Sequence, residues 1–187
     1  MTARLLAKIL PHSTNLTNDG SASSKPLFSA SDVAAALAYG SLPKPAYHLG
    51  MAKYCNDLDA ERHLLKHLHR KIQYTITRKK WRNAEHRAEN LALLVIRECI
   101  HEGRCKRCDG HGFIVRLTGK DRLNYGKPCK ACDATGIARL SATQQAKIAN
   151  ISTPSWIKIW RPRHENFVQY AHDLESRVSR HLKQQLL

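Results

Sequence analysis

The chain has 187 residues, a formal net charge of +16 and six cysteines. This length allows one or two small domains, and no apolar run approaches the length that spans a bilayer, so we expect no membrane partner. Lys8 interrupts the apolar N-terminal stretch and Pro11 ends it without a cleavage site, so it does not read as a signal peptide. We therefore expect a reducing cytoplasm, where disulfides are rare.

The basic excess extends over the whole chain, with 31 Lys and Arg against 15 Asp and Glu. Such a surface concentrates polyanions and speeds their capture, so nucleic acid is the expected partner. Charge alone does not separate DNA from RNA.

Residues 1–28 are expected to form a flexible N-terminal arm, since 12–28 are rich in Ser, Asn and Thr. Residues 29–187 are expected to form a helical domain. Its first helix starts at Ser29 or Ser31 and stops at Gly40, and the segment "SLPKPAYH" (41–48) reads as a proline-rich turn.

Two long helices are predicted before the cysteine-rich segment, over 57–77 and from about Trp81 to His101. Apolar residues recur at helical spacing in both. The expected stripes are Leu58, Leu65, Leu68, Ile72 and Ile76 in the first, and Ala84, Ala88, Leu91, Val95 and Cys99 in the second.

Helical signals return after the cysteines. Ser141 caps a helix that turns near Asn150, and a second helix starts at Thr153–Pro154. The segment "RPRH" (161–164) predicts a break, followed by a last helix from about Glu165. Because little β pattern exists outside "GFIVRL", the predicted fold class is mainly α, with a metal-sized insertion at 104–136.

Four cysteines form two Cys-x-x-Cys pairs, Cys105 with Cys108 and Cys129 with Cys132, separated by 20 residues. Thiolates suit Zn²⁺, and each tight turn presents two sulfurs to one ion. We therefore predict one structural Zn²⁺ in a four-cysteine knuckle. Ala134 stands where the first pair has a glycine, Gly110.

Other cysteine chemistry fits this pattern less well. A redox dithiol needs a thioredoxin-like βαβ context, and the spacing is not a familiar iron–sulfur pattern. A catalytic zinc keeps an open position, whereas four cysteines fill the shell. Cys55 and Cys99 lack partners at motif spacing and are expected to be small apolar residues.

The sequence resembles the late-gene antitermination proteins of lambdoid phages, the lambda-type Q family. The resemblance is carried by "FSASDVAAALAYG…YHLGMAKYC", then "RCKRCDGHG…PCKACDATG", then "ARLSATQQAKIANISTPSWIKIWRPRHENFVQYAHDLE", over roughly residues 28–180. The Ala134 substitution and the basic segment between the pairs depart from the family's pattern.

The resemblance implies a transcription factor without enzymatic activity in the cytoplasm of the bacterial host. Such proteins bind double-stranded late-promoter DNA and engage paused RNA polymerase through its sigma factor and β flap. They then let the enzyme read through terminators. The expected partners are thus promoter DNA and RNA polymerase, with no small-molecule substrate.

The order of the predicted helices around the cysteine segment favours a helix-turn-helix, in one of two versions. Either the helices at 81–101 and 141–150 meet with the knuckle inserted between them, or 141–150 pairs with 153–160. The expected phosphate and base contacts come from the residues around the knuckle and from the helix that follows it. They are Lys106, Arg107, Arg116, Lys120, Arg122, Lys130, Arg139, Gln144, Gln145 and Lys147.

Two readings compete with this one. The first is a zinc-containing RNA-binding or ribosome-associated protein. The second is an enzyme, which we do not expect because no Ser/His/Asp set, paired catalytic carboxylates or phosphate-binding loop is present.

Overall fold

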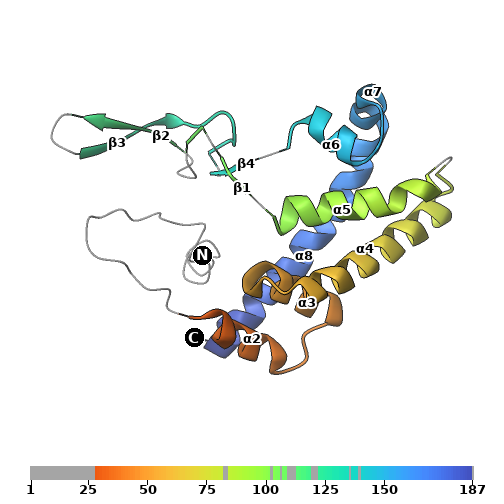
Figure 1. Ribbon diagram of the computed structural model, residues 1–187, viewed down its shortest axis with the longest axis horizontal. Helices are drawn as coiled ribbons and strands as arrows, with labels where there is room; N and C mark the ends of the chain where they lie inside the picture. Colours follow the sequence, from red (N-terminus) through yellow and green to blue (C-terminus); the bar gives the residue numbers. More distant parts are fainter. Residues whose placement is uncertain are drawn as a thin grey trace.

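The computed structural model describes residues 28–81, 84–101, 103–105, 107–108, 113–118, 122–134, 136–138 and 140–186. The expected arm, 1–28, lies outside this part except for Phe28. The described chain is mainly helical, as predicted (Figure 1). Its helices are α2 (Ala30–Ala38), α3 (Lys44–Cys55), α4 (Leu58–Arg78), α5 (Ala88–Cys99), α6 (Ala142–Ile148), α7 (Thr153–Ser155) and α8 (Arg161–Leu186), with a 3₁₀ turn η1 (Glu85–Arg87) and a π-helix η2 (Trp156–Trp160).

The core lies where α8 packs against α2, α3 and α5, while α4 packs on α3 and α5. Helix α4 contributes Leu64, Leu68, Ile72 and Ile76, one face at intervals of four. Leu58 was expected in this stripe but is exposed at the first position of the helix. The predicted α5 stripe is fully buried. Among the described helices, none combines the length and apolarity needed to cross a bilayer.

The two predicted serine caps are confirmed. The Ser29 hydroxyl accepts from the N–H of Asp32, and the Ser141 hydroxyl accepts from that of Gln144. In return, the Asp32 side chain accepts a hydrogen bond from the backbone N–H of Ser29, and the Gln144 side chain accepts one from that of Ser141. Both capping boxes therefore satisfy the helix ends as expected.

The segment 41–48 is not only a turn, so that prediction was wrong. Helix α3 begins at Lys44, with Pro43 as its N-cap and Pro45 in its first turn. Proline costs little there, because the first N–H groups of a helix have no partner within the helix. The prolines start the helix instead of preventing it.

Helix α5 starts seven residues later than the predicted Trp81, because α4 ends in a tight motif at this point. The N–H of Trp81 donates to the carbonyl of Ile76, and that of Lys80 donates to Thr77. Lys80 has φ of +50°, the left-handed conformation that this helix ending requires.

The predicted break at "RPRH" was also wrong. Helix α7, η2 and α8 follow one another without interruption from Thr153 to Leu186. The π-helical turn comes directly before Pro162, and the N–H of Arg161 reaches back to the carbonyl of Trp156. This wider turn makes room for a residue that has no N–H and a bulky ring, so the helix continues through it.

A partly buried ion pair links α3 to α8. Lys53 Nζ lies 2.8 Å from Glu175 Oε1, and the Tyr54 hydroxyl donates to the same oxygen. Burial raises the pKa of the Glu175 carboxyl, whereas the hydrogen bond from His172 and the Lys53 ammonium lower it. The lowering effects are larger in sum, so the pKa falls from 4.5 to about 2.

This carboxylate predicts a pH dependence of stability. Because its folded-state pKa is depressed, its contribution is present above pH 4.5 and is lost as the pH falls toward about 2. Above pH 4.5 we expect the free energy of unfolding of the wild type to exceed that of Glu175→Gln by about 2 kcal/mol. Below about pH 2 the two free energies of unfolding should be equal. Denaturant unfolding across this pH range measures the difference. Glu165→Gln, at an exposed position of α8, is the matched control and should show no such convergence.

The insertion contains two small antiparallel sheets: β1 (Gly103–Arg104) pairs with β4 (Ile137–Ala138), and β2 (Phe113–Thr118) pairs with β3 (Arg122–Pro128). Strand β2 matches the predicted "GFIVRL", whereas β3 was missed because glycine and proline weaken its β pattern. A bulge lies beside Gly126, where a Cβ would come 2.8 Å from the carbonyl oxygen of Ile114. Only glycine fits that close approach.

Candidate metal centre

The two short strands bring the cysteine pairs together. Cys105 follows β1 and Cys129 follows β3, and each begins a turn that carries the second cysteine of its pair. The turns are closed by backbone hydrogen bonds from Cys108 to Cys105 and from Cys132 to Cys129. In Figure 1 the β2–β3 hairpin extends from this region away from the helices.

The four sulfurs have the spacing of a tetrahedral metal site. All four lie within 4.8 Å of one another, with 3.9 Å between Cys105 and Cys129 Sγ and 3.7 Å between Cys108 and Cys132 Sγ. Four thiolates bound to Zn²⁺ at about 2.3 Å would be separated by about 3.8 Å. None of the six cysteines forms a disulfide, whose sulfurs would lie about 2.05 Å apart. The predicted cysteine set could therefore bind one metal ion.

Backbone N–H groups point at two of the four sulfurs, those of Cys105 and Cys132. The backbone N–H of Arg107 is the main cause that lowers the pKa of Cys105 to about 7. The N–H of Gly136 donates to Cys132 Sγ at 3.3 Å. Such N–H donors stabilise the charge that a metal-binding sulfur carries.

Ala134 carries a backbone cost at the second turn. Its φ is +62°, a conformation that costs a residue with a Cβ roughly 1 kcal/mol. We expect Ala134→Gly to raise the melting temperature of the metal-bound insertion by relieving about 1 kcal/mol. Ala131→Gly, in the same turn without a positive φ, is the control. An equal gain in both variants, measured by calorimetry, would contradict this explanation.

Nine of the ten expected DNA-contacting residues fall into three groups. Arg107, Lys130, Gln144 and Lys147 are exposed. Arg116 lies opposite Asn124 in the hairpin and Arg122 opposite Thr118, but only their backbone is described. The structure does not describe Lys106, Lys120 and Arg139.

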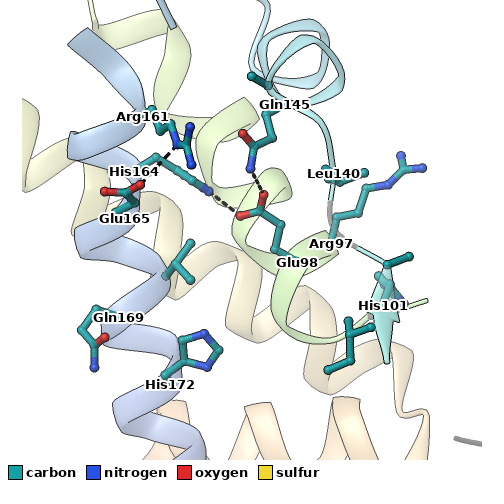
Figure 2. Close-up of a pocket in the computed structure, with 14 residues that line it drawn as sticks. Arg97, Glu98, His101, Leu140, Gln145, Arg161, His164, Glu165, Gln169 and His172 are labelled. Atoms are coloured by element: carbon teal, nitrogen blue, oxygen red, sulfur yellow. Dashed lines mark hydrogen bonds and ion pairs between the residues drawn. The ribbon is translucent and has the colours of Figure 1, made fainter. Parts of the chain in front are cut away.

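Gln145 has a different environment from the one expected for a base-reading residue. Its side-chain NH₂ donates to Glu98 Oε1 at 2.6 Å (Figure 2). Its side-chain oxygen accepts from Trp156 Nε1 at 3.1 Å. Both polar groups are used within the protein, so Gln145 is not among the DNA contacts proposed below. Trp156 and Trp160 are buried, as expected for core residues.

Two short helices follow the insertion in the order that the second helix-turn-helix version requires. Helix α6 ends near Asn150, whose φ is +53°, and α7 starts at Thr153. Helix α6 packs against α5, α7 and η2.

A polar cluster that sequence reasoning missed joins α5, α6 and α8. Glu98 Oε2 lies 2.8 Å from His164 Nε2, and Glu98 Oε1 accepts the hydrogen bond from Gln145. The cluster borders a pocket of about 750 Å³, in which Figure 2 shows Arg161 paired with Glu165. Gln145 and His164 are 47 and 66 residues from Glu98 in the sequence, so no local sequence pattern predicts that they meet.

Fold and site together define a mainly helical protein with an insertion whose four clustered cysteines could bind one metal ion. No family model matches the chain. No curated protein matches it either.

Proposed function

We propose that this protein is a zinc-stabilised transcription antitermination factor of the lambdoid phage Q type. It binds double-stranded late-promoter DNA, engages paused RNA polymerase through sigma and the β flap, and lets the enzyme read through terminators. It works without enzymatic chemistry, in the cytoplasm of the bacterial host.

The observation that carries this proposal is the buried four-sulfur cluster within a chain of net charge +16. Four thiolates select zinc among the common cations and leave no open position for catalysis. The sequence resemblance on both sides of the cluster supports the choice of antitermination among the roles open to a basic zinc protein.

Zinc would act here as a structural clamp. The insertion leaves the helical body just after α5 (Ala88–Cys99) and returns just before α6 (Ala142–Ile148). Among the described residues, only the cysteines and the half-buried Ile114 form its apolar cluster. The ion would therefore supply the free energy that such a small lobe lacks, and it would fix the two helix ends relative to each other.

The exposed cations around the clamp would bind phosphates. Arg107, Lys127 and Lys130 surround the cysteine turns, and Lys147 is exposed on α6. Four thiolates and one Zn²⁺ sum to a charge of about −2, which these cations offset. The lobe and α6 would then present a rigid basic surface to duplex DNA.

A terminator readthrough reaction tests the proposal. Purified polymerase on a template with a phage late promoter and a downstream terminator should yield readthrough transcripts when the zinc-loaded protein is added. In parallel, competitor RNA at moderate salt should leave the protein bound to a promoter duplex.

The controls separate the two leading functions. A template with a scrambled promoter element should give no readthrough. Absence of readthrough with active polymerase and intact promoter would refute antitermination. If RNA displaces the promoter duplex as well, the zinc-containing RNA-binding alternative replaces it.

A further inference from the structure

A second basic site lies at the other end of α5 from the metal centre, and the sequence analysis did not single it out. It is a groove of about 450 Å³ where the end of α4, η1, η2 and the start of α8 meet. Four of its lining residues are cations: Lys79, Lys80, Arg87 and Arg163. None of its described lining residues is acidic.

Two tryptophans hold the arginines in place. The Arg163 guanidinium lies 4.4 Å from the ring centroid of Trp81 and 5.1 Å from that of Trp160, and the Arg87 guanidinium lies 5.1 Å from Trp160. The two indoles pack edge to face, with centroids 5.8 Å apart. Stacking fixes the planes of guanidinium groups and leaves N–H donors at their edges for an anion. Arg87 also donates from Nε to His86 Nε2 at 3.4 Å, so its terminal NH₂ groups are the donors that it offers to the groove.

The lysines are held by the end of α4. The Schellman-type hydrogen bonds of Lys80 and Trp81 fix this corner, and Lys80 adopts a positive φ there without being glycine. Within the described chain, no ion pair involves any of the four cations.

The kind of ligand follows from what the groove exposes. Trp160 is buried and Arg163 covers one face of Trp81, so the groove presents cations where these rings would otherwise be open. A compact anion that accepts hydrogen bonds from several donors fits four converging cations. We propose that this groove binds backbone phosphates of duplex DNA, as a second anchoring point separate from the zinc lobe.

The inference rests on the proposed function and adds a location to it. Helix α5 starts at the groove and ends at the insertion, and its 12 residues span about 18 Å. That length corresponds to about five base pairs along a B-DNA axis. The phosphate contacts of the two sites should then contribute independently to binding.

The test uses the full-length, zinc-loaded protein and fluorescein-labelled duplexes, one with the promoter sequence and one scrambled. Lys79→Gln/Arg163→Gln removes two groove cations. We expect affinity for both duplexes to fall on the order of tenfold, with an unchanged preference between them. The slope of log K against log salt should decrease by about 2, as for two lost phosphate contacts.

The matched control is Arg180→Gln/Lys183→Gln, which removes two exposed cations near the other end of α8. Its salt slope should equal that of the wild type. Lys79→Gln/Lys80→Gln provides a second groove variant that leaves the stacked arginines in place, in case Arg163→Gln prevents folding. Its slope should decrease by about 2 as well.

The outcomes separate this inference from the proposed function. If the wild type prefers the promoter duplex but the folded groove variants keep its affinity and slope, the groove is not a phosphate site and the proposed function stands. An equal slope change in the control also overturns the inference. A labelled single-stranded RNA serves as a third probe, and a slope change seen only with this RNA overturns the inference as well. If the wild type binds no duplex, both fall together.

Discussion

Replacing Cys129 with serine is expected to release the metal and unfold the insertion. Cys129 is fully buried, and its sulfur lies 3.9 Å from that of Cys105. A serine hydroxyl is a poor zinc ligand, and metal binding supplies on the order of ten kcal/mol of folding free energy in small zinc modules. Apart from the cysteines, the described part of this lobe offers only Ile114 to such a cluster.

Metal content and limited proteolysis measure the effect. Elemental analysis should give one zinc per chain for the wild type and none for Cys129→Ser. Proteolysis should cut the variant between 104 and 136 while the helical body remains folded. The helical core is a separate cluster of buried residues, so it does not depend on the ion for its own packing.

Cys55→Ser is the control for loss of a thiol. Cys55 lies on α3, where its sulfur hydrogen-bonds to the carbonyl of Ala30 and is not part of the four-sulfur cluster. This variant should keep one zinc and resist proteolysis in the insertion. A Cys129→Ser protein that retained one equivalent of metal would show that the site is misassigned.

The cysteine set could be predicted because its signal is local. Two residues between the members of each pair fix a turn, and any fold that closes the loop brings the turns together. The helices with regular apolar spacing were predictable for the same reason. Ile72 in α4 and Val95 in α5, for example, each lie four residues from another buried residue of the same helix, the spacing of a buried helix face.

The errors arose where one residue type permits two structures. Pro43 and Pro45 suit a turn and equally the first turn of α3. Pro162 ends most helices, but here a π-helical turn absorbs it, and that turn depends on the packing of Trp156 and Trp160 in the core. Local propensity cannot register such support from distant elements.

The groove and the Glu98 cluster were beyond prediction because their members come together only in the fold. Lys79 and Arg163 are 84 residues apart in the sequence and line the same groove. Gln145 reads in the sequence as a candidate base contact, and only its hydrogen bonds to Glu98 and Trp156 show that it holds helices together.

Glu98→Ala is expected to destabilise the helical body by about 3 kcal/mol, because it removes the acceptor shared by two helices. His164 is buried and its Nδ1 has no hydrogen-bond partner among the described residues, so loss of Glu98 leaves the whole ring without one. The side-chain NH₂ of Gln145 would lose its acceptor at the same time, while its oxygen keeps the hydrogen bond from Trp156. Leaving buried polar groups unsatisfied costs about 1 to 3 kcal/mol each.

Thermal unfolding and two further variants test this explanation. For a chain of this size, 3 kcal/mol corresponds to a fall of about 10 °C in melting temperature. Glu98→Gln keeps an acceptor oxygen in place and should lose less than Glu98→Ala. Glu89→Ala, at an exposed position in the first turn of the same helix, should change the melting temperature by only 1 or 2 °C, since surface substitutions cost about 0.5 kcal/mol or less. If Glu98→Ala melted with Glu89→Ala, the carboxylate would not hold α6 and α8 against α5, and the position of α6 beside the metal centre would need another cause.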